Sequence, residues 1–358
     1  MTYDFIVIGG GIAGTSAGSQ LAQLGAVCLL ETEGALAYHS SGRSAALYEA
    51  QYGLPTTVAL NRASREAHET LDGGLLTPRG LMLLAAEGDE GAFRDDCTKM
   101  HLDPLSPSEA QAMVPILDTS HIQAAAYHSE AWDIDTDRMV QHYARQIRAN
   151  GTVETAAKAT TITRTPHGWQ VKTDQSTFNA HTLVNAAGAW ADQIAALAGI
   201  APIGLTPFRR SMARMPAPGG HDVSHWPMLF GVNESWYAKP DAGAWLVSPA
   251  EEDLTEPHDA FADDMVLAEG IARYQPFVTE EVTRVTSSWA GLRTFAPDRS
   301  LVIGPEPADP CFLWFAGQGG YGFQTAPAAS ALLADLVSGR TPHLDRGTVD
   351  ALSPSRLR

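Results

Sequence analysis

Two glycine-rich loops near opposite ends of the chain are the residues best suited to bring a ligand close to the backbone. The first holds Gly9, Gly11 and Gly14 in the spacing G-x-G-x-x-G, directly after an apolar run that ends at Ile8. The second is the stretch "AGQGGYGFQT", residues 316–325. Because the first spacing lets a pyrophosphate approach the N–H groups at a helix N-terminus, it predicts a dinucleotide site.

An acidic residue follows the first loop at the distance that ribose recognition requires. The pattern runs strand, turn, helix and a second buried strand, "AVCLLE", which ends at Glu31. An acid about 20 residues after the glycines is placed to accept hydrogen bonds from ribose hydroxyls. A glycine triplet alone is also typical of an ordinary tight turn, so the prediction depends on this agreement of spacing, strands and acid.

The elements that must position these residues interleave along the chain. Residues 133–151 read as an Asp-capped helix, and short alternating strands are expected over 159–174 and 176–180. A buried strand, a small-residue turn and a helix over 182–199 then return the chain to the first sheet. The stretches between hold most of the Pro, Met and Trp and read as one substrate-binding lobe. We therefore predict a dinucleotide-binding domain from residues 1–45, 131–205 and 295–358, and a substrate-binding domain from the insertions 46–130 and 206–294.

The composition excludes several classes of partner. With 41 acidic and 24 basic side chains among 358 residues, the net charge of −17 repels nucleic acid and anionic lipid surfaces. Three dispersed cysteines without a C-x-x-C pair indicate neither a disulfide framework nor a metal site. No secretory signal is evident, and polar residues interrupt the longest apolar region, so we expect a cytoplasmic protein with no transmembrane segment. Nothing in the sequence indicates the oligomeric state.

Five separated motifs, taken in order, together resemble the D-amino acid oxidase superfamily of FAD-dependent amine oxidoreductases. They are "GGGIAG" with Glu31, "YHSSGRSAALY", "VNAAGAWAD", "WAGLRTFAPD" and "GQGGYGFQT". Within the superfamily they look most similar to bacterial D-arginine dehydrogenase. The resemblance covers essentially the whole chain and implies a mixed α/β fold, in which a Rossmann-like FAD-binding lobe joins an antiparallel-sheet substrate lobe made from the two insertions.

The resemblance also implies where FAD lies. The C-terminal glycine loop is expected against the flavin ring, and the helix after it, with Pro327 early, is expected to turn its positive end toward the reduced flavin. The serines and arginine of "SSGRSAA" are expected under the flavin, donating to phosphate or ring atoms. The predicted FAD-binding residues are Gly9, Gly11, Ile12, Ala13, Gly14, Glu31, Ser40, Ser41, Arg43, Ser44, Ala45, Ala46, Ala159, Ala187, Gly188, Trp190, Arg293, Gly317, Gly319, Gly320, Tyr321, Gly322, Gln324 and Thr325.

We expect FAD to be bound without a covalent link. His39 stands in an "HxxG" setting in which some related amine dehydrogenases bond the flavin, but the most similar relatives carry this histidine without a bond. The cysteine that sarcosine oxidases use for attachment has no counterpart in "WAGLRTFAPD". His39 is therefore predicted to be structural.

By the same resemblance, Arg293 and Arg210 match a carboxylate clamp, to which Tyr237 adds a hydroxyl. A guanidinium suits this role because it forms a two-pronged, charge-assisted pair with a carboxylate. Neighbouring strand residues point to opposite faces, so only one of Arg209 and Arg210 should reach the site, although a lone arginine is more usually exposed. The predicted catalytic residues are Tyr52, on an active-site lid, Arg210, Tyr237, Arg293 and Gly320, whose carbonyl would meet the substrate amine.

Two departures from the arginine-type relatives bear on the substrate. Leu81 stands where those relatives have an acid, and Leu47 where they have a histidine. A cationic side chain would therefore enter an apolar pocket unpaired, which is strongly unfavourable. We predict FAD-dependent oxidative deamination of D-amino acids with neutral or apolar side chains, giving imino acids and then 2-oxo acids.

Two alternatives remain open at this point. The chain could oxidise N-alkyl amino acids, as sarcosine and glycine oxidases do, because both substrate classes share the carboxylate clamp. It could also be a flavin-binding protein without turnover. Leu246 stands where oxygen-using sarcosine oxidases place a lysine over the flavin, so we predict a dehydrogenase whose electron acceptor is a quinone or similar compound.

Overall fold

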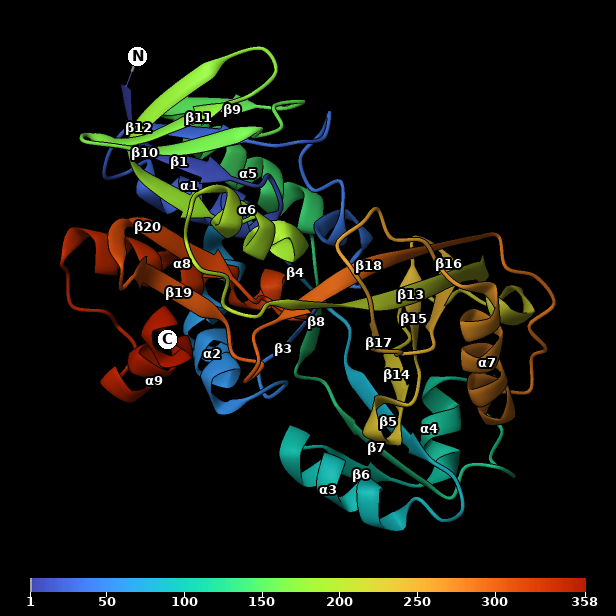
Figure 1. Cartoon of the computed structure of the whole chain (residues 1–358). Coiled ribbons are helices and arrows are strands. Elements are labelled where there is room, and N and C mark those ends of the chain that lie inside the picture. The colour runs from blue at the N-terminus through green and yellow to red at the C-terminus, as the bar shows by residue number, and fades with distance from the viewer. Residues whose placement is uncertain (1) are drawn as a thin grey trace.

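The computed structural model describes residues 2–358. In its first sheet, the glycine turn follows β1, a strand that is parallel to both of its neighbours (Figure 1). The strand order is β10-β11-β12-β1-β2-β9, with β20 beside β12 and β19 beside β20. Five strands, β9, β2, β1, β12 and β20, run parallel, and the others are antiparallel to their neighbours. The strands are β1 (Thr2–Ile8), β2 (Val27–Leu30), β9 (Gly151–Glu154), β10 (Thr161–Thr165), β11 (Gly168–Lys172), β12 (Thr177–Asn185), β19 (Val302–Glu306) and β20 (Asp309–Ala316).

Helices cover this sheet because their apolar faces need burial. Helix α1 (Ile12–Leu21) is buried along nearly its whole length and packs against α5 (Thr136–Ala149) and α8 (Gly322–Ser338). The helix α2 (Pro55–Thr70) packs on α8 as well, through Leu60. The remaining helices of this lobe are α6 (Ala191–Leu197) and α9 (Arg346–Leu352).

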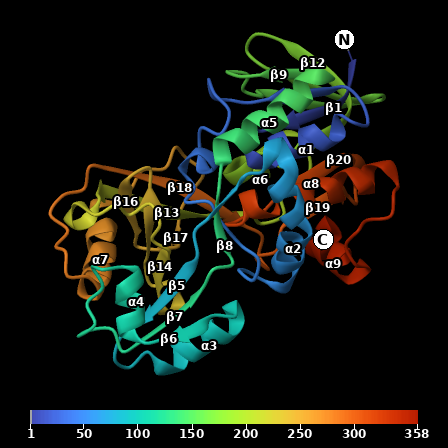
Figure 2. The ribbon, with the colours of Figure 1, turned by 180° about the vertical axis from the view of Figure 1, so that it is seen from behind.

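The second sheet belongs to the other lobe and draws on both insertions (Figure 2). Its order is β17-β13-β16-β15-β14-β5-β7-β6, with β18 on the other edge of β13. All neighbours are antiparallel except β5 and β14, which are parallel and join the first insertion to the second. The strands are β5 (Leu81–Ala85), β6 (Asp103–Leu105), β7 (Ala124–His128), β13 (Thr206–Pro216), β14 (Met228–Gly231), β15 (Tyr237–Asp241), β16 (Ala244–Ser248), β17 (Asp253–Leu254) and β18 (Ser287–Phe295).

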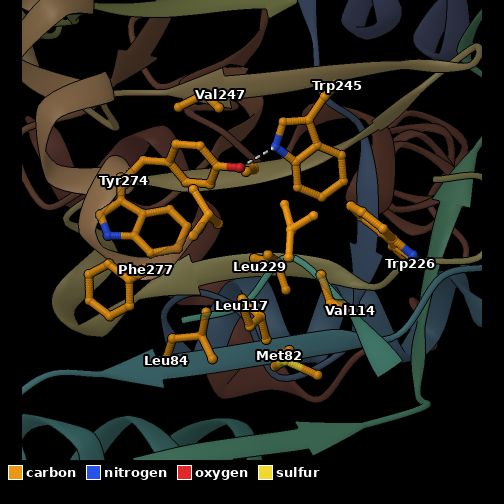
Figure 3. Close-up of a cluster of buried hydrophobic side chains, with 14 of the residues drawn as sticks. Met82, Leu84, Val114, Leu117, Trp226, Leu229, Trp245, Val247, Tyr274 and Phe277 are labelled. Atoms are coloured by element: carbon orange, nitrogen blue, oxygen red, sulfur yellow. Dashed lines mark hydrogen bonds between the residues drawn. The ribbon is translucent and has the colours of Figure 1, made fainter. Parts of the chain in front are cut away.

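An aromatic core fixes this second sheet to its helices (Figure 3). Trp226 and Trp245 pack edge to face, and the indole N–H of Trp245 donates to the hydroxyl of Tyr274 at 3.0 Å. A buried aromatic residue with a polar group needs such a partner, so this bond also fixes the orientation of α7. The helices of this lobe are α3 (Glu90–Met100), α4 (Pro107–Met113) and α7 (Asp264–Tyr274).

A small third sheet in the order β3-β8-β4 lies where the first insertion leaves and rejoins the first lobe. Its strands are β3 (Leu47–Glu49), β4 (Leu76–Pro78) and β8 (Ala131–Ile134). No helix within residues 2–358 has the length and apolar character needed to cross a bilayer.

The mixed α/β fold class predicted from the sequence is confirmed, with corrections in detail. The strands expected over 176–180 and from 182 are one strand, β12, because its first half pairs with β11 and its second half with β20. Helix α8 begins at Gly322, so Pro327 is early in the helix, as expected, but not in its first turn. Proline is accommodated there because it lies in the second turn, where only one backbone hydrogen bond is lost. The domain boundaries stay a prediction. Helix α2 lies within residues 46–130, the first insertion assigned to the substrate-binding domain, but it packs on the first lobe.

Candidate active site

A cavity of about 870 Å³ runs between the two lobes, within the range of cofactor and substrate pockets. One end is formed by the glycine turn before α1 and by the end of β2. The other end is formed by β13, β14 and β18 of the second sheet and by the C-terminal glycine loop. The cavity therefore joins the predicted dinucleotide site to the predicted substrate site.

The dinucleotide end is held by close backbone packing. A Cβ atom on Gly14 would lie 1.8 Å from the carbonyl oxygen of Gly9, so only glycine permits this turn. The carboxylate of Glu31 accepts hydrogen bonds from the N–H groups of Gly10 at 2.6 Å and Glu33 at 2.8 Å. The N-cap Gly11 has no side chain to cap α1; Ser41 accepts the N–H of Ile12, and the N–H groups of Ala13 and Gly14 are left to an anion.

The serines and arginine of the next motif line the cavity, but their bonds run to the protein. The Ser41 hydroxyl accepts the N–H of Ile12 at 2.9 Å, and the Ser40 hydroxyl donates to the carbonyl of Leu292 at 2.7 Å. Arg43 donates to two backbone carbonyls at 2.8 and 3.0 Å. These bonds fasten the turn of residues 40–43 between α1 and β18, so its backbone and small side chains form the cavity wall.

His39 is surrounded by carboxylates. Its Nε2 lies 3.0 Å from Glu33, and its Nδ1 lies 3.7 Å from Asp259. The ring packs against Trp190 with 4.7 Å between centroids. Both ring nitrogens have acidic neighbours, which supports the structural role predicted for this residue.

The C-terminal loop shows why glycines gather there. A Cβ atom on Gly320 would lie 2.9 Å from the guanidinium carbon of Arg293, so glycine leaves room for that side chain. Gly319, Gly322 and Gln324 also line the cavity, at the N-terminus of α8. The loop therefore brings the positive end of a helix and an arginine to the same wall.

Two arginines point into the cavity from neighbouring strands. Phe208 of β13 is opposite Arg293 of β18, and Arg210 follows Phe208 by two residues, so both arginines lie on one face of the sheet. Arg210 is only 4% exposed; its Nη2 lies 3.5 Å from Glu252, but its Nε and Nη1 have no hydrogen-bond partner among residues 2–358. Arg209 points to the other face, where it pairs with Asp253 at 2.7 Å. The pair of cations in the cavity is thus arranged to receive an anion.

Neighbouring groups keep the Arg293 guanidinium charged. Burial lowers the pKa of Arg293, but the nearby Tyr52 and Glu234 help to raise it by more. The guanidinium of Arg210 lies 5.9 Å from the ring centroid of Tyr237, which also lines the cavity.

Apolar side chains form the wall beside these arginines. Leu47 and Leu81 line the cavity, as predicted from the sequence. Four further apolar residues line it that the sequence did not indicate: Met100, Met212, Met228 and Phe230. Met212 follows Arg210 by two residues, so strand alternation could have identified it. This wall suits an apolar substituent of the ligand.

Glu234 is an unpredicted carboxylate at this end of the cavity. The Tyr52 hydroxyl donates to its Oε1 at 2.5 Å. Burial, followed by the charge of Glu234, raises the pKa of Tyr52 well above its usual value, so the hydroxyl remains a donor. Glu234 lies in an irregular turn whose sequence has no periodic pattern. The one feature of the sequence that could have indicated its role is its position three residues before Tyr237.

Most residues predicted from the sequence lie on the cavity wall, and four do not. Gly14 packs behind the first turn, and Thr325 donates to the carbonyl of Tyr321 at 2.8 Å within α8. The ring of Tyr321 packs 5.2 Å from that of Tyr52, and Gly317 precedes the loop. Other wall residues that the sequence did not indicate include Gly10, Glu33, Lys158, Gln193 and Phe323.

Known proteins resemble the chain along nearly its whole length. The family model described as DAO, FAD dependent oxidoreductase, matches residues 4–336. FAD-dependent oxidoreductase domain-containing protein 1 of Bos taurus is 27% identical over 93% of this chain and 81% of that protein. Monomeric sarcosine oxidase of Streptomyces avermitilis is 27% identical over 99% of this chain and 98% of that protein. The crystal structure of glycine oxidase from Geobacillus kaustophilus shares the fold, with a TM-score of 0.83, 22% identity and coverage of 99% of both chains.

Proposed function

Because the chain belongs to the DAO family of FAD dependent oxidoreductases, we propose that it oxidises the carbon–nitrogen bond of an amino acid, using FAD. The observation that supports an amino acid most directly is the arginine pair. Arg210 is buried beside Arg293, and although Glu252 lies 3.5 Å from its Nη2, its Nε and Nη1 have no hydrogen-bond partner among residues 2–358, which is unfavourable for buried donors. A substrate carboxylate completes this arrangement.

The residues present fit FAD. Glu31 and the N-terminus of α1 offer a carboxylate for ribose and N–H groups for pyrophosphate at one end. The turn of residues 40–43 and the glycines of the C-terminal loop leave a wall without large side chains at the other end. Bound there, FAD supplies the acceptor of two electrons and the chain supplies orientation.

The chain's own residues then have the task of positioning. Arg210 and Arg293 would hold the carboxylate, Tyr237 would add a hydroxyl, and the Gly320 carbonyl would meet the amine. The apolar wall would hold the substituent and exclude water from the reacting carbon. Such fixed placement of reacting atoms supplies a large part of the rate enhancement in reactions of this type.

Two substrate classes fit this arrangement. The relatives named sarcosine oxidase and glycine oxidase favour glycine or an N-alkyl amino acid, which was the alternative from the sequence. The wall formed by Leu47, Leu81 and the methionines favours an amino acid with an apolar side chain, as in the first sequence prediction, whose D configuration comes from the family resemblance alone. The likeness to D-arginine dehydrogenase stays a prediction from motifs alone.

The electron acceptor is a separate question. Leu246 is buried in β16 and does not line the cavity. Opposite it on β15 stands Lys239, whose Nζ donates to the carbonyl of Ala45 at 2.7 Å, and Ala45 lines the cavity. Lys239, whose Nζ also pairs with Asp133 at 2.5 Å, thus lies just behind the wall. The predicted quinone acceptor therefore does not follow from Leu246 alone.

Anaerobic flavin reduction by a substrate panel tests the proposal. Sarcosine, glycine, D-Leu, D-Met and D-Arg are added to the holoenzyme, and the loss of flavin colour is followed. We expect bleaching by sarcosine or by D-Leu and D-Met, and little by D-Arg. No bleaching by any of them with FAD bound would instead support a flavin protein without turnover. Reoxidation by oxygen and by an artificial quinone is then compared with the best substrate.

Acid precipitation tests how FAD is attached. We propose that FAD is non-covalent, because His39 is engaged with Glu33 and Asp259 and no cysteine lies in the β18 motif. The yellow colour should remain in the supernatant. A yellow pellet would show a covalent link.

A further inference from the structure

The carboxylate of Glu234 lies where the amino group of a clamped substrate needs a partner. It lines the same end of the cavity as Arg210 and Arg293 and contributes to the raised pKa of Arg293. Its Oε1 accepts the Tyr52 hydroxyl at 2.5 Å, and its Oε2 accepts no hydrogen bond from residues 2–358. One oxygen is thus fixed by the protein, and the other is open to a ligand.

The backbone at Glu234 supports a functional role. Asn233 and Glu234 have φ angles of +56° and +51°, in the left-handed region that residues with a Cβ rarely adopt. Asp96 accepts the N–H of Asn233 at 2.8 Å, and the N–H of Gly231 donates to the carbonyl of Trp236 at 3.0 Å, so both sides of the turn are fixed. Strained backbone of this kind persists mainly where it positions a functional group.

Among residues 2–358, no other carboxylate that lines this end of the cavity has an oxygen without a close protein partner. Glu49 also lines the cavity, but its Oε1 accepts the N–H of Gln51 at 2.9 Å and its Oε2 lies 2.8 Å from His128. Glu31 and Glu33 belong to the dinucleotide end, where they accept backbone N–H groups or pair with His39. Glu234 is therefore the carboxylate available to a substrate amine.

The charges also require such a group. Arg210 and Arg293 bring two positive charges, and an amino acid at neutral pH brings a carboxylate and an ammonium. Glu252 lies 3.5 Å from Arg210, and the substrate carboxylate neutralises Arg293, so the ammonium remains the one positive charge without a counter-ion. A carboxylate beside the clamp supplies that counter-ion.

We propose that Glu234 binds the substrate's ammonium group and accepts its proton before oxidation. This inference rests on the proposed function and deepens it. An ammonium cannot form a C=N bond, because its lone pair is held by a proton. One N–H bond breaks and its proton moves to the Glu234 carboxylate, which becomes a carboxylic acid, while the electron pair stays on nitrogen. The Cα–H then leaves with its two electrons for the bound FAD, and the nitrogen lone pair forms the C=N bond of the iminium product.

A matched pair of ligands separates the amine subsite from the carboxylate clamp. 2-Methylalanine carries both groups but lacks a Cα hydrogen, so it binds without being oxidised. Isobutyrate has the same carbon skeleton without the amine. Dissociation constants for both are measured by calorimetry with FAD-loaded wild-type protein, Glu234→Gln and a surface control, Glu130→Gln.

Glu234→Gln should weaken 2-methylalanine binding about 10-fold or more, the usual value of a charge-assisted hydrogen bond. Isobutyrate binding should change less than about twofold, since its carboxylate still meets the arginines, and Glu130→Gln should match the wild type. Anaerobic flavin reduction at saturating substrate should also slow at least about 100-fold in Glu234→Gln, within the range of general-base effects. Equal losses for both ligands, or an unchanged saturated rate, would overturn the proposal.

Two further proteins keep the result interpretable. Glu234→Asp retains the carboxylate one methylene further back and should recover part of the 2-methylalanine affinity, which a merely structural defect would not allow. Arg293→Met should weaken both ligands. If the wild type binds neither ligand and Arg293→Met changes nothing, the proposed amino acid site itself is wrong. If Arg293→Met weakens both but Glu234→Gln spares 2-methylalanine, only the amine subsite is wrong.

Discussion

At the scale of single residues, the unpaired guanidinium groups are the clearest sign of a ligand. Arg210 keeps two N–H groups without partners although it is buried. In a folded protein most such groups are paired, so the exceptions call for an explanation. Here a carboxylate supplied by the substrate gives one.

Replacing one arginine should therefore affect substrate binding and spare the cofactor. Arg293→Met should cost about 2–5 kcal/mol of substrate binding, because a buried carboxylate loses its partner. FAD content should stay near that of the wild type. The control is Arg209→Met, on the opposite face of β13, where Asp253 is its partner. Anaerobic titration of flavin reduction with substrate is carried out on both variants. An unchanged titration curve for Arg293→Met would remove this residue from the clamp.

A buried histidine should make stability depend on pH. His68 has no exposed surface, and its Nε2 lies 3.0 Å from the carbonyl of Gln324, while its Nδ1 has no partner. Burial lowers its pKa from 6.5 to about 4. Between these values the unfolded chain binds more protons, so the free energy of unfolding falls as the pH falls from 6.5 toward 4. This residue should account for up to about 3 kcal/mol of the loss.

Denaturant unfolding at several pH values checks this contribution. His68→Gln keeps a donor toward Gln324 without a titrating ring, so its stability should vary less between pH 4 and 6.5. The exposed His181→Gln should follow the wild type. Identical pH profiles for all three proteins would show that His68 does not cause the loss.

At the scale of elements, the strand–turn–helix at the N-terminus determines whether FAD binds at all. Gly14 sets how closely α1 approaches β1, since a Cβ atom there would lie 1.8 Å from the Gly9 carbonyl oxygen. Moving the helix outward would also move the N–H groups at its start, which are expected to meet pyrophosphate.

Gly14→Ala should therefore lower both FAD content and stability. The ratio of flavin to protein absorbance after purification should fall several-fold, and thermal unfolding should begin earlier. Gly91→Ala in α3 is the matched control, because nothing lies within 4 Å of the added methyl group. Alanine has the higher helix propensity, so the control should be as stable as the wild type or up to about 1 kcal/mol more so. Full flavin loading of Gly14→Ala would contradict this reading of the turn.

The elements also show what the sequence could predict. The first turn, Glu31 and the helix after Asp135 were predictable because glycine spacing, an acid at a fixed distance and apolar periodicity are local signals. Strand alternation, also a local signal, predicted that only one of Arg209 and Arg210 reaches the site, and the family resemblance selected Arg210. The start of α8 was misplaced, because its first turn packs around the cavity and lacks its own capping signal. Glu234 was missed because its position depends on a strained turn held by Asp96, far away in sequence.

At the scale of the whole molecule, the cavity draws its walls from both lobes, so a bound cofactor should hold them together. A ligand that binds only the folded state stabilises it by about 2.7 kcal/mol at a free concentration of 100 times its dissociation constant. Removing FAD should therefore lower the melting temperature, and adding it back should raise it in a concentration-dependent way.

Differential scanning calorimetry of the flavin-free protein tests this effect. Riboflavin is the control ligand, because it lacks the pyrophosphate and adenosine that Glu31 and α1 are expected to hold. It should stabilise the protein much less than FAD at equal concentration. If FAD and riboflavin raised the melting temperature equally, or if neither raised it, the dinucleotide end of the cavity would contribute little to FAD binding.

The parallel pairing of β5 with β14 has a consequence for how the chain is made. After β5 has been synthesised, β7 can pair with one of its edges, but the other edge has no partner until residues 228–231 follow, and the first sheet waits longer still, for β20 at 309–316. Neither lobe can be completed in isolation during synthesis, and long-range strand pairing of this kind is slow. A nascent chain that ends between β7 and β14 exposes one unpaired edge of β5, and unpaired strand edges of this kind promote aggregation. Folding of both lobes is therefore largely a post-translational event, and yield in expression should depend more on chaperone capacity than on the stability of the finished protein.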